Sequence, residues 1–480
     1  MEDVITNFQH DQNELLDSFL NMSFVEMKNT PFNEGRMFKV LEIIVTPECN
    51  QKCEYCYLNK YGHESYPMDI RADKETTLHN IKMLMDYLTY EKRYYFREYE
   101  LFAGDLFTTG YFFDLMDLLY PYFEFIYNKA PELFNREKGF SGLLITIPNN
   151  LRFIEDDNIT QQVLEVYNKY KKIGTLINFS WSHDGKYSCD QREGFQLSDE
   201  YYDKAFRFLE ETGSGIHPMM SPEGAKYAIE NHKWWQEMYK KYLPTRLKLN
   251  EYHAFHLEVR NDGWTDEAIS NYLKYLKFRM TEYFKLCNNE IDKVAYTLFK
   301  GDGDMPGSLR RPDGDIDAFN VVVNPVYIGY NRTTCMLQNS LIIRASDLAI
   351  VPCHRLAYHQ FIGGWYETDE ENTKIIGVKA NNPGQLINLK TFRTDLAPVC
   401  VTCWNKNNCL KGCLGSQFEW SGEVYLPVLS VCKFQKAKTS FVLKMLCETG
   451  VLGSALDQGI IPEEQKKHLI NLCERLGYQI

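Results

Sequence analysis

The sequence predicts an α/β fold built around a parallel sheet or barrel. Six short apolar runs alternate with longer helical patterns across the first 300 residues, and a cluster of cysteines follows the first run directly. Strands that alternate with helices are typical of βα units, which form parallel sheets. Functional groups in such folds lie at the carboxyl ends of the strands. The cysteines therefore occupy the place where this fold class carries its chemistry.

The elements follow in chain order. An amphipathic helix is expected at Glu14–Lys28, and the apolar, β-branched run Val40–Val45 predicts the first strand. The later strands are expected at Glu98–Phe102, Leu143–Ile147, Leu176–Trp181, Ile216–Met220 and Ala254–Val259. The helices are expected at Lys74–Leu88, Tyr111–Tyr127, Ile159–Lys172, Glu200–Glu211, Glu223–Tyr242 and Asp266–Leu286. The turn-rich, polar stretch Gly301–Asp317 indicates a linker or a loop over the site.

Composition narrows the class of protein. The chain has 480 residues, long enough for two or three domains, with 44% hydrophobic and 25% charged residues, as in globular proteins. A net charge of −12 argues against nucleic acid as a partner. There is no secretory signal at the N-terminus and no apolar stretch long enough to span a membrane. Fourteen cysteines without an export signal indicate metal ligands in a reducing cytoplasm.

The first cysteine cluster has the spacing C-x3-C-x2-C. It consists of Cys49, Cys53 and Cys56, and no fourth cysteine lies nearby. Three thiolates hold three corners of a [4Fe–4S] cube and leave one iron open to a small molecule. Half of a zinc site, or a chance spacing, remains the alternative.

This spacing resembles the signature of the radical S-adenosylmethionine (SAM) superfamily. The resemblance implies a partial (β/α)6 barrel in which the open iron binds the amino and carboxylate groups of SAM, with Tyr55 near the adenine. After the second strand the family usually has Gly-Gly-Glu, which binds the SAM amino group; here the residues are Ala103, Gly104 and Asp105. Gly104 still permits a close backbone approach, and Asp105 keeps an acceptor that is one methylene shorter.

A second SAM segment follows the fourth strand. Ser182, Asp184 and Arg192 match an S-x-D-G segment with a following arginine in peptide-modifying radical SAM enzymes. The resemblance implies that the serine and arginine contact the ribose and carboxylate of SAM. An arginine suits a carboxylate because its two N–H groups bond both oxygens.

Seven cysteines of the C-terminal third match the SPASM extension of that superfamily. The match implies one auxiliary [4Fe–4S] cluster on Cys335, Cys353 and Cys413, with no identified fourth ligand, and a second on Cys400, Cys403, Cys409 and Cys432. Two zinc sites are the alternative. Four other cysteines are expected to be small buried apolar residues: Cys189, Cys287, Cys447 and Cys473.

Two positions depart from the family. Leu348 stands where members often have glycine, five residues before Cys353. His354 replaces the aspartate base of anaerobic sulfatase maturases, and we expect it to support the cluster region structurally rather than to act as the base.

The resemblance implies an enzyme that cleaves SAM reductively to a 5′-deoxyadenosyl radical. This radical takes hydrogen from a side chain of a ribosomally made peptide, and an intramolecular C–C, C–O or thioether cross-link follows, with the auxiliary clusters assisting the oxidation. Side-chain oxidation without a ring, and a non-catalytic electron carrier, are the alternatives. The expected partners are the precursor peptide and a low-potential electron donor of the flavodoxin or ferredoxin type. A leader peptide would use another surface or a separate leader-binding protein, because few residues precede the first strand.

The predicted domains follow from these motifs. They are an N-terminal helical extension (1–38), the radical SAM barrel (39–300), a linker (301–330), the SPASM domain (331–435) and C-terminal helices (436–480). Arg260 and Asn261, after the sixth strand, are the candidate substrate contacts.

Overall fold

The computed structural model describes most of the chain. The described residues are 2–23, 39–58, 72–102, 104–134, 142–188, 192, 197–243, 258–259, 263–300, 339–391, 397–406, 409, 413–461 and 463–480. They divide into two compact units. The first comprises Met1–Ser182, Leu197–Ile216 and Met336–Phe392, and the second comprises His183–Gln196, His217–Cys335 and Arg393–Ile480.

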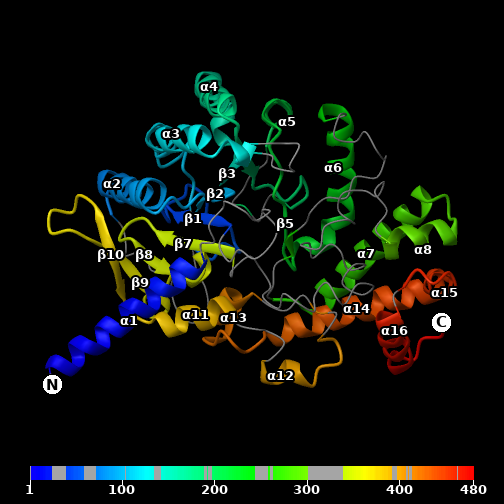
Figure 1. Ribbon diagram of the computed structural model, residues 1–480. Helices are drawn as coiled ribbons and strands as arrows, with labels where there is room; N and C mark the ends of the chain where they lie inside the picture. Colours follow the sequence, from blue (N-terminus) through cyan, green and yellow to red (C-terminus); the bar gives the residue numbers. More distant parts are fainter. Residues whose placement is uncertain are drawn as a thin grey trace. The chain divides into compact units, whose positions relative to one another are not determined.

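The first unit is built on an eight-stranded sheet (Figure 1). Five parallel strands occupy one side, in the order β7 (Ser340–Arg344), β1 (Val40–Ile44), β2 (Glu98–Phe102), β3 (Leu143–Asn149) and β4 (Thr175–Trp181). Beyond β7 the sheet continues through antiparallel strands β8 (Ala349–Val351), β9 (Gly364–Thr368) and β10 (Ile375–Ala380). β1, the first of the parallel strands along the chain, is therefore an interior strand of the sheet.

Helices cover one face of the parallel strands (Figure 1). They are α2 (Lys74–Met85), which continues as a π-helical segment (Asp86–Glu91), α3 (Phe112–Lys129), α4 (Asp157–Lys172) and α5 (Asp199–Thr212). Side chains cap the starts of α2, α4 and α5: Asp73 accepts from the Thr76 N–H, Asp156 from the Ile159 N–H, and Ser198 from the Tyr201 N–H. The caps explain why these helices begin where the sequence predicts.

The two faces of the parallel strands differ in polarity. Tyr99 is buried and its ring lies 4.7 Å from the Phe123 ring of α3, so this face meets the helices. On the opposite face the register places four polar residues side by side, one from each of β1 to β4: Glu42, Glu100, Thr146 and Asn178. The face away from the helices therefore carries a polar row across four strands.

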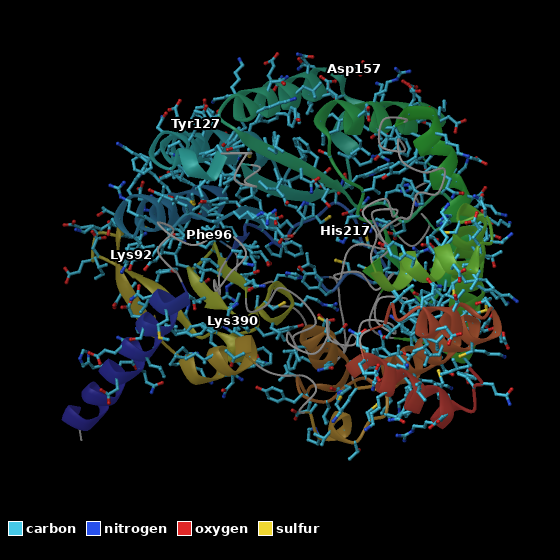
Figure 2. All side chains as sticks on the ribbon, turned by 45° about the vertical axis from the view of Figure 1, so that its right-hand side comes forward. Lys92, Phe96, Tyr127, Asp157, His217 and Lys390 are labelled. Carbon is cyan, nitrogen blue, oxygen red and sulfur yellow. The ribbon has the colours of Figure 1, made fainter. Side chains whose placement is uncertain are left out.

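The N-terminal helix α1 (Glu2–Ser23) lies along the antiparallel end of the sheet, beside β10 (Figure 1). The Gln9 amide donates to the Ala380 carbonyl at 3.0 Å, and the Ala380 N–H donates to Asn13 Oδ1 at 2.8 Å. Helix α11 (Pro383–Thr391) packs nearby, and its Lys390, labelled in Figure 2, is fully buried and donates to the Ser340 and Pro352 carbonyls. The N-terminal helix and the segment 383–391, far apart in the chain, thus both belong to the first unit.

The second unit is mainly helical. Its elements are β5 (Met219–Met220), β6 (Glu258–Val259), α6 (Ala228–Tyr242), α7 (Asp266–Leu286), α8 (Ile291–Lys300), α12 (Pro398–Val401), α13 (Leu414–Ser421), α14 (Leu429–Glu448), α15 (Val451–Asp457) and α16 (Glu463–Leu476). β5 and β6 pair in parallel. The stacked rings of Trp264 and Phe434, 4.1 Å apart, join the start of α7 to α14.

Short 3-10 turns complete the described elements. They span Pro131–Phe134, Arg152–Glu155, Gly224–Tyr227, His354–Leu356 and His359–Phe361. Among the described residues, no helix is both long and apolar enough to cross a membrane.

The predicted elements agree closely with the structure. The second strand and the helix Asp266–Leu286 have the predicted bounds. The N-terminal helix was predicted at Glu14–Lys28 but spans Glu2–Ser23, so it begins more than three turns earlier. The other predicted strands and helices are present with small shifts. Ile216 forms only a bridge to Trp181, so the fifth strand is shorter than predicted. The structure adds β7 to β10, which were not predicted. Residues 24–28, 254–257 and the stretch 301–317 lie outside the described part of the chain, and the predicted domain boundaries remain predictions.

Candidate active site and cluster ligands

The first cysteine loop begins where β1 ends. The Val45 N–H donates to the Phe102 carbonyl at 3.0 Å, which holds the loop start to the end of β2. Within the loop, the Cys56 N–H donates to the Cys53 carbonyl at 3.0 Å, and the Gln51 N–H points at Cys49 Sγ at 3.4 Å. Tyr55 lies half-buried in this turn. Three cysteines are therefore presented at the carboxyl end of the parallel strands, as predicted.

The turn after β2 packs directly on this loop. Gly104 has a φ of +59°, and a Cβ at this position would lie 1.9 Å from the Glu48 carbonyl oxygen. The Asp105 N–H donates to the same oxygen at 2.9 Å. Only glycine allows two backbone segments to approach this closely. The turn predicted to bind SAM thus also holds the residue that precedes Cys49.

The Asp105 carboxylate is buried and engaged within its own turn. Its Oδ1 accepts hydrogen bonds from the N–H groups of Phe107 and Thr108 and from the Thr108 hydroxyl, at 2.9 to 3.0 Å. Its Oδ2 lies 3.4 Å from the Asn150 N–H. These contacts shape the turn, and a contact of Asp105 with SAM remains a prediction.

A third strand end joins the same site through residues that the sequence analysis missed. The Asn150 amide, just after β3, donates to Asn50 Oδ1 at 3.0 Å, and Asn50 directly follows Cys49. The Tyr201 hydroxyl of α5 donates to the Asn150 carbonyl at 2.8 Å. The Ser182 N–H, after β4, donates to the Asn149 carbonyl at 2.8 Å. The ends of four successive strands are therefore linked around the cysteine loop.

The electrostatics of this loop fit a bound iron cluster. Partial exclusion of water, together with the smaller effect of the nearby negative charges of Asp105 and Cys56, raises the pKa of the Cys49 thiol to about 11. Thiols that repel one another's thiolate forms stay protonated until a cation draws them together, because metal coordination deprotonates a thiol outright. The Gln51 N–H that faces Cys49 Sγ is the kind of donor that tunes cluster thiolates. Cys49, Cys53 and Cys56 would hold the cube.

The segment after Cys353 packs against the same loop. Phe102 stacks on His354 with ring centroids 4.1 Å apart, and the Arg355 guanidinium lies 5.5 Å from the Tyr57 ring, one residue after Cys56. His354 Nδ1 lies 2.7 Å from Oε1 of Glu42, a buried residue of the polar row. His354 is thus held by a carboxylate and a ring, in agreement with the expected structural role.

Leu348, which stands where the family often has glycine, adopts a glycine-like backbone conformation. Its φ is +59°, in the left-handed region that glycine adopts most readily, and its side chain is buried. The chain therefore keeps the backbone conformation that glycine favours at this turn between β7 and β8. The buried leucine side chain offsets the strain through apolar packing.

The segment after β4 shows a tightly organised ion pair. Arg192 Nη2 lies 2.8 Å from Asp184 Oδ1, and the Asp184 side chain is 0% exposed. The Met219 N–H donates to the same oxygen at 2.8 Å. Asp184 therefore orients Arg192, and the contacts of Ser182, Asp184 and Arg192 with SAM remain predictions.

His183, between these residues, is neutral. Burial lowers its pKa to about 3, against the opposing effect of Asp184. Its Nδ1 accepts the Gly185 N–H at 3.0 Å, and its ring lies 5.5 Å from that of Trp235. The histidine is part of the packed interior behind the turn.

Four C-terminal cysteines gather within the second unit. Burial raises the pKa of the Cys432 thiol to about 11, and the negative charges of Cys409, Cys400 and Cys403 raise it further. Such mutual effects require the thiols to be close together. They are the four residues assigned to the second auxiliary cluster. The chain brings them together from a short helix, two turns and the start of α14.

The remaining predicted site residues fall into two groups. Cys353 is buried in the first unit and Cys413 precedes α13 in the second. Cys335, Ala103, Arg260, Asn261 and Cys189 lie outside the described residues. In the described part, no group of three or more His, Cys, Asp or Glu side chains has the spacing of a single-ion site.

These features define the fold. The chain combines a parallel α/β sheet, a three-cysteine loop at the carboxyl end of β1 and a cysteine-rich C-terminal region.

Several solved structures are similar to this chain. One, described as native anSMEcpe with bound AdoMet, matches with a TM-score of 0.50 at 14% identity, over 87% of this chain and 99% of that chain. SuiB of Streptococcus suis bound to S-adenosylmethionine matches with a TM-score of 0.42 at 15% identity, over 83% and 77%. SuiB bound to precursor peptide SuiA matches with a TM-score of 0.42 at 15% identity, over 90% and 89%. No protein-family model matches the chain, and no curated protein matches it in sequence.

Proposed function

We propose that this chain is a radical SAM enzyme that modifies a ribosomally synthesised peptide, forming an intramolecular cross-link from one of its side chains. The single observation that carries the proposal is the cysteine loop after β1. Its residues are hydrogen-bonded to the ends of β2 and β3 through Asp105 and Asn150. When bound, the [4Fe–4S] cluster would supply the electron that splits SAM into methionine and a 5′-deoxyadenosyl radical.

The residues of the chain would hold and orient the cofactor. Cys49, Cys53 and Cys56 would ligate three irons, and the exposed backbone of Gly104 would face the SAM amino group. Arg192, oriented by Asp184, would bond the SAM carboxylate or ribose. We assign Ser182 to SAM as well. The packed strand ends would keep water from the radical, because a reactive radical needs a closed, preorganised site.

The polar row offers a surface for the peptide. Glu42, Glu100, Thr146 and Asn178 lie on the sheet face opposite the helices, and His354 reaches Glu42 there. In this class the two auxiliary clusters would accept the electron released when the new bond closes. Their proposed ligands are the cysteines at 335, 353 and 413, and those at 400, 403, 409 and 432. We further propose a low-potential electron donor of the flavodoxin or ferredoxin type and a cytoplasmic location.

The test is anaerobic turnover of the reconstituted protein with dithionite and SAM. We expect 5′-deoxyadenosine from the wild-type protein and none from the triple variant Cys49→Ala/Cys53→Ala/Cys56→Ala. That variant should also lose about four of about twelve irons. The matched control is Cys287→Ala, a buried thiol outside the ligand sets, which should keep its iron and its product.

A second arm tests the substrate. The protein is incubated with the small peptide encoded beside its gene, and the product is sequenced by tandem mass spectrometry. Loss of two hydrogens together with a bridging fragment supports the cross-link. Loss of two hydrogens without a bridge indicates side-chain oxidation, the alternative. A triple variant that retains full iron and product would refute the proposal.

A further inference from the structure

Two cysteines outside the cluster ligand sets face each other in the C-terminal helices. Cys447 lies in the last turn of α14 and Cys473 lies in α16, and their sulfur atoms are 3.8 Å apart. Cys473 is 0% exposed, whereas Cys447 is partly exposed. One thiol is therefore open to a reagent and the other is held behind it.

The two helices are fixed to each other by further contacts. The Ser440 hydroxyl of α14 lies 2.6 Å from the Tyr478 hydroxyl, and the Tyr478 N–H donates to the Cys473 carbonyl at 2.9 Å. Leu443 of α14 and Leu469 of α16 are both fully buried. Helix packing, and not one flexible contact, therefore holds the two sulfur atoms opposite each other.

We propose that Cys447 and Cys473 are a redox-active pair that a low-molecular-weight disulfide converts to an intramolecular disulfide, joining α14 to α16. A disulfide bond is about 2.05 Å long, so the sulfurs need to approach by less than 2 Å. Rotation of the two cysteine side chains about their Cα–Cβ bonds moves the sulfurs by distances of this order. This inference does not depend on the proposed function.

The chemistry balances in two exchange steps. The Cys447 thiolate attacks the reagent disulfide, forms a mixed disulfide and releases one reagent thiol. Cys473 then loses its proton, its sulfur attacks the Cys447 sulfur, and the second reagent thiol leaves. Two protein thiols are oxidised and one reagent disulfide is reduced to two thiols.

The order of the two cysteines follows from their surroundings. The hydrogen bond from the Cys473 thiol lowers the pKa of Cys447, and the same bond raises the pKa of Cys473. Cys447 is also the thiol that solvent reaches. A thiolate-prone, accessible cysteine beside a second thiol is the arrangement of reversible redox sites.

The bond would act on the helix that carries a cluster ligand. Cys432 lies in the first turn of α14, and Cys447 lies in its last turn. A link to α16 would restrain the far end of α14 when the surroundings become oxidising, and reduction would release it.

The experiment uses the anaerobic, iron-loaded full chain treated with glutathione disulfide, followed by alkylation and non-reducing peptide mapping. We expect the Cys447 and Cys473 peptides to be joined, two hydrogens lighter than their sum, with two free thiols lost and the iron content unchanged. In Cys473→Ser we expect Cys447 to carry one glutathione, because no second thiol resolves it. In Cys447→Ser we expect Cys473 to remain an unmodified thiol. Cys287→Ser, the matched control, should still form the link.

Three results would overturn the inference. The first is alkylation of both thiols in the wild-type protein after treatment, and the second is a stable glutathione adduct on Cys447 of the wild-type protein. The third is loss of iron while Cys447 and Cys473 stay reduced. Circular dichroism of both serine variants checks that their helices are retained, so that a failure to link reports the chemistry.

Discussion

Replacing Gly104 with alanine should disturb the cysteine loop more than any other single methyl group added to this site. The new Cβ would lie 1.9 Å from the Glu48 carbonyl oxygen, 2.7 Å from the Glu48 carbonyl carbon and 2.9 Å from the Thr46 oxygen. Ordinary contact begins at 3.4 Å, so the backbone beside Cys49 has to move by about 1.5 Å. No flexible side chain can absorb that movement, because all three atoms belong to the backbone.

The size of the effect follows from two costs. A non-glycine residue at φ +59° costs about 1 to 2 kcal/mol, and the steric overlap costs about 1 to 3 kcal/mol more. The matched control is Gly213→Ala at the end of α5, where φ is +69° and a Cβ would meet nothing within 4 Å. It carries only the first cost. The two variants therefore separate backbone strain from displacement of the loop.

The assay compares both variants by thermal unfolding, iron content and the SAM-induced change in the spectrum of the reduced protein. We expect Gly104→Ala to be less stable than Gly213→Ala by about 1 to 3 kcal/mol, to lose about four irons and to give no SAM response. Gly213→Ala should keep its iron and its response. If Gly104→Ala retains both at the level of the control, the close packing of the two loops does not position the cluster.

Three further outcomes are expected. Lowering the pH from 6.5 to 5 should reduce the free energy of unfolding by about 2 kcal/mol through His183. The folded pKa of about 3 lies below the unfolded value, so only the unfolded chain takes up the proton. In urea unfolding measured at both pH values, the free energy of unfolding of His183→Gln should fall less than that of the wild-type protein. Asp184→Asn should destabilise the protein by about 3 kcal/mol in thermal unfolding, since Arg192 loses its buried partner. It should also weaken SAM binding measured by calorimetry. An unchanged stability and an unchanged SAM affinity would contradict the role of the ion pair. Cys432→Ser should lower the iron content by about four while Cys287→Ser leaves it unchanged, and equal iron in the two would contradict the assigned second auxiliary cluster.

Much of the first unit could be predicted because its signals are local. The run Glu98–Phe102 alternates buried and half-buried residues, and its bounds match the strand. The strands β7 and β8 carry a similar signal, since the apolar runs Leu341–Ile343 and Ala349–Val351 flank a polar turn. They were missed because the cysteine spacing in this region indicated a separate module. The pairing of β7 with β1 joins residues far apart in the chain, and no local pattern encodes it.

The site divides in the same way. Cys49 and Gly104 follow predicted strands directly, so their motifs placed them correctly at the strand ends. Asn50 and Asn150 meet only after the sheet forms. Asn50 occupies a variable position of the cysteine motif and Asn150 stands in no recognisable motif. Glu42 offered a signal that was not used: a charged residue inside an apolar strand needs a buried partner, and the structure supplies His354.

The pairing of β1 with β7 has a consequence for biosynthesis. The two strands begin at residues 40 and 340, so the ribosome has to add 300 further residues before the second neighbour of β1 exists. At ordinary rates of translation that interval lasts about 15 to 60 s. Until then the backbone N–H and C=O groups along one edge of β1 are unpaired, and such an apolar edge favours pairing with other chains. A nascent chain shortened before residue 336 would keep this edge for its whole lifetime, and ribosome-bound fragments of that length should recruit chaperones more strongly than fragments that extend past residue 392.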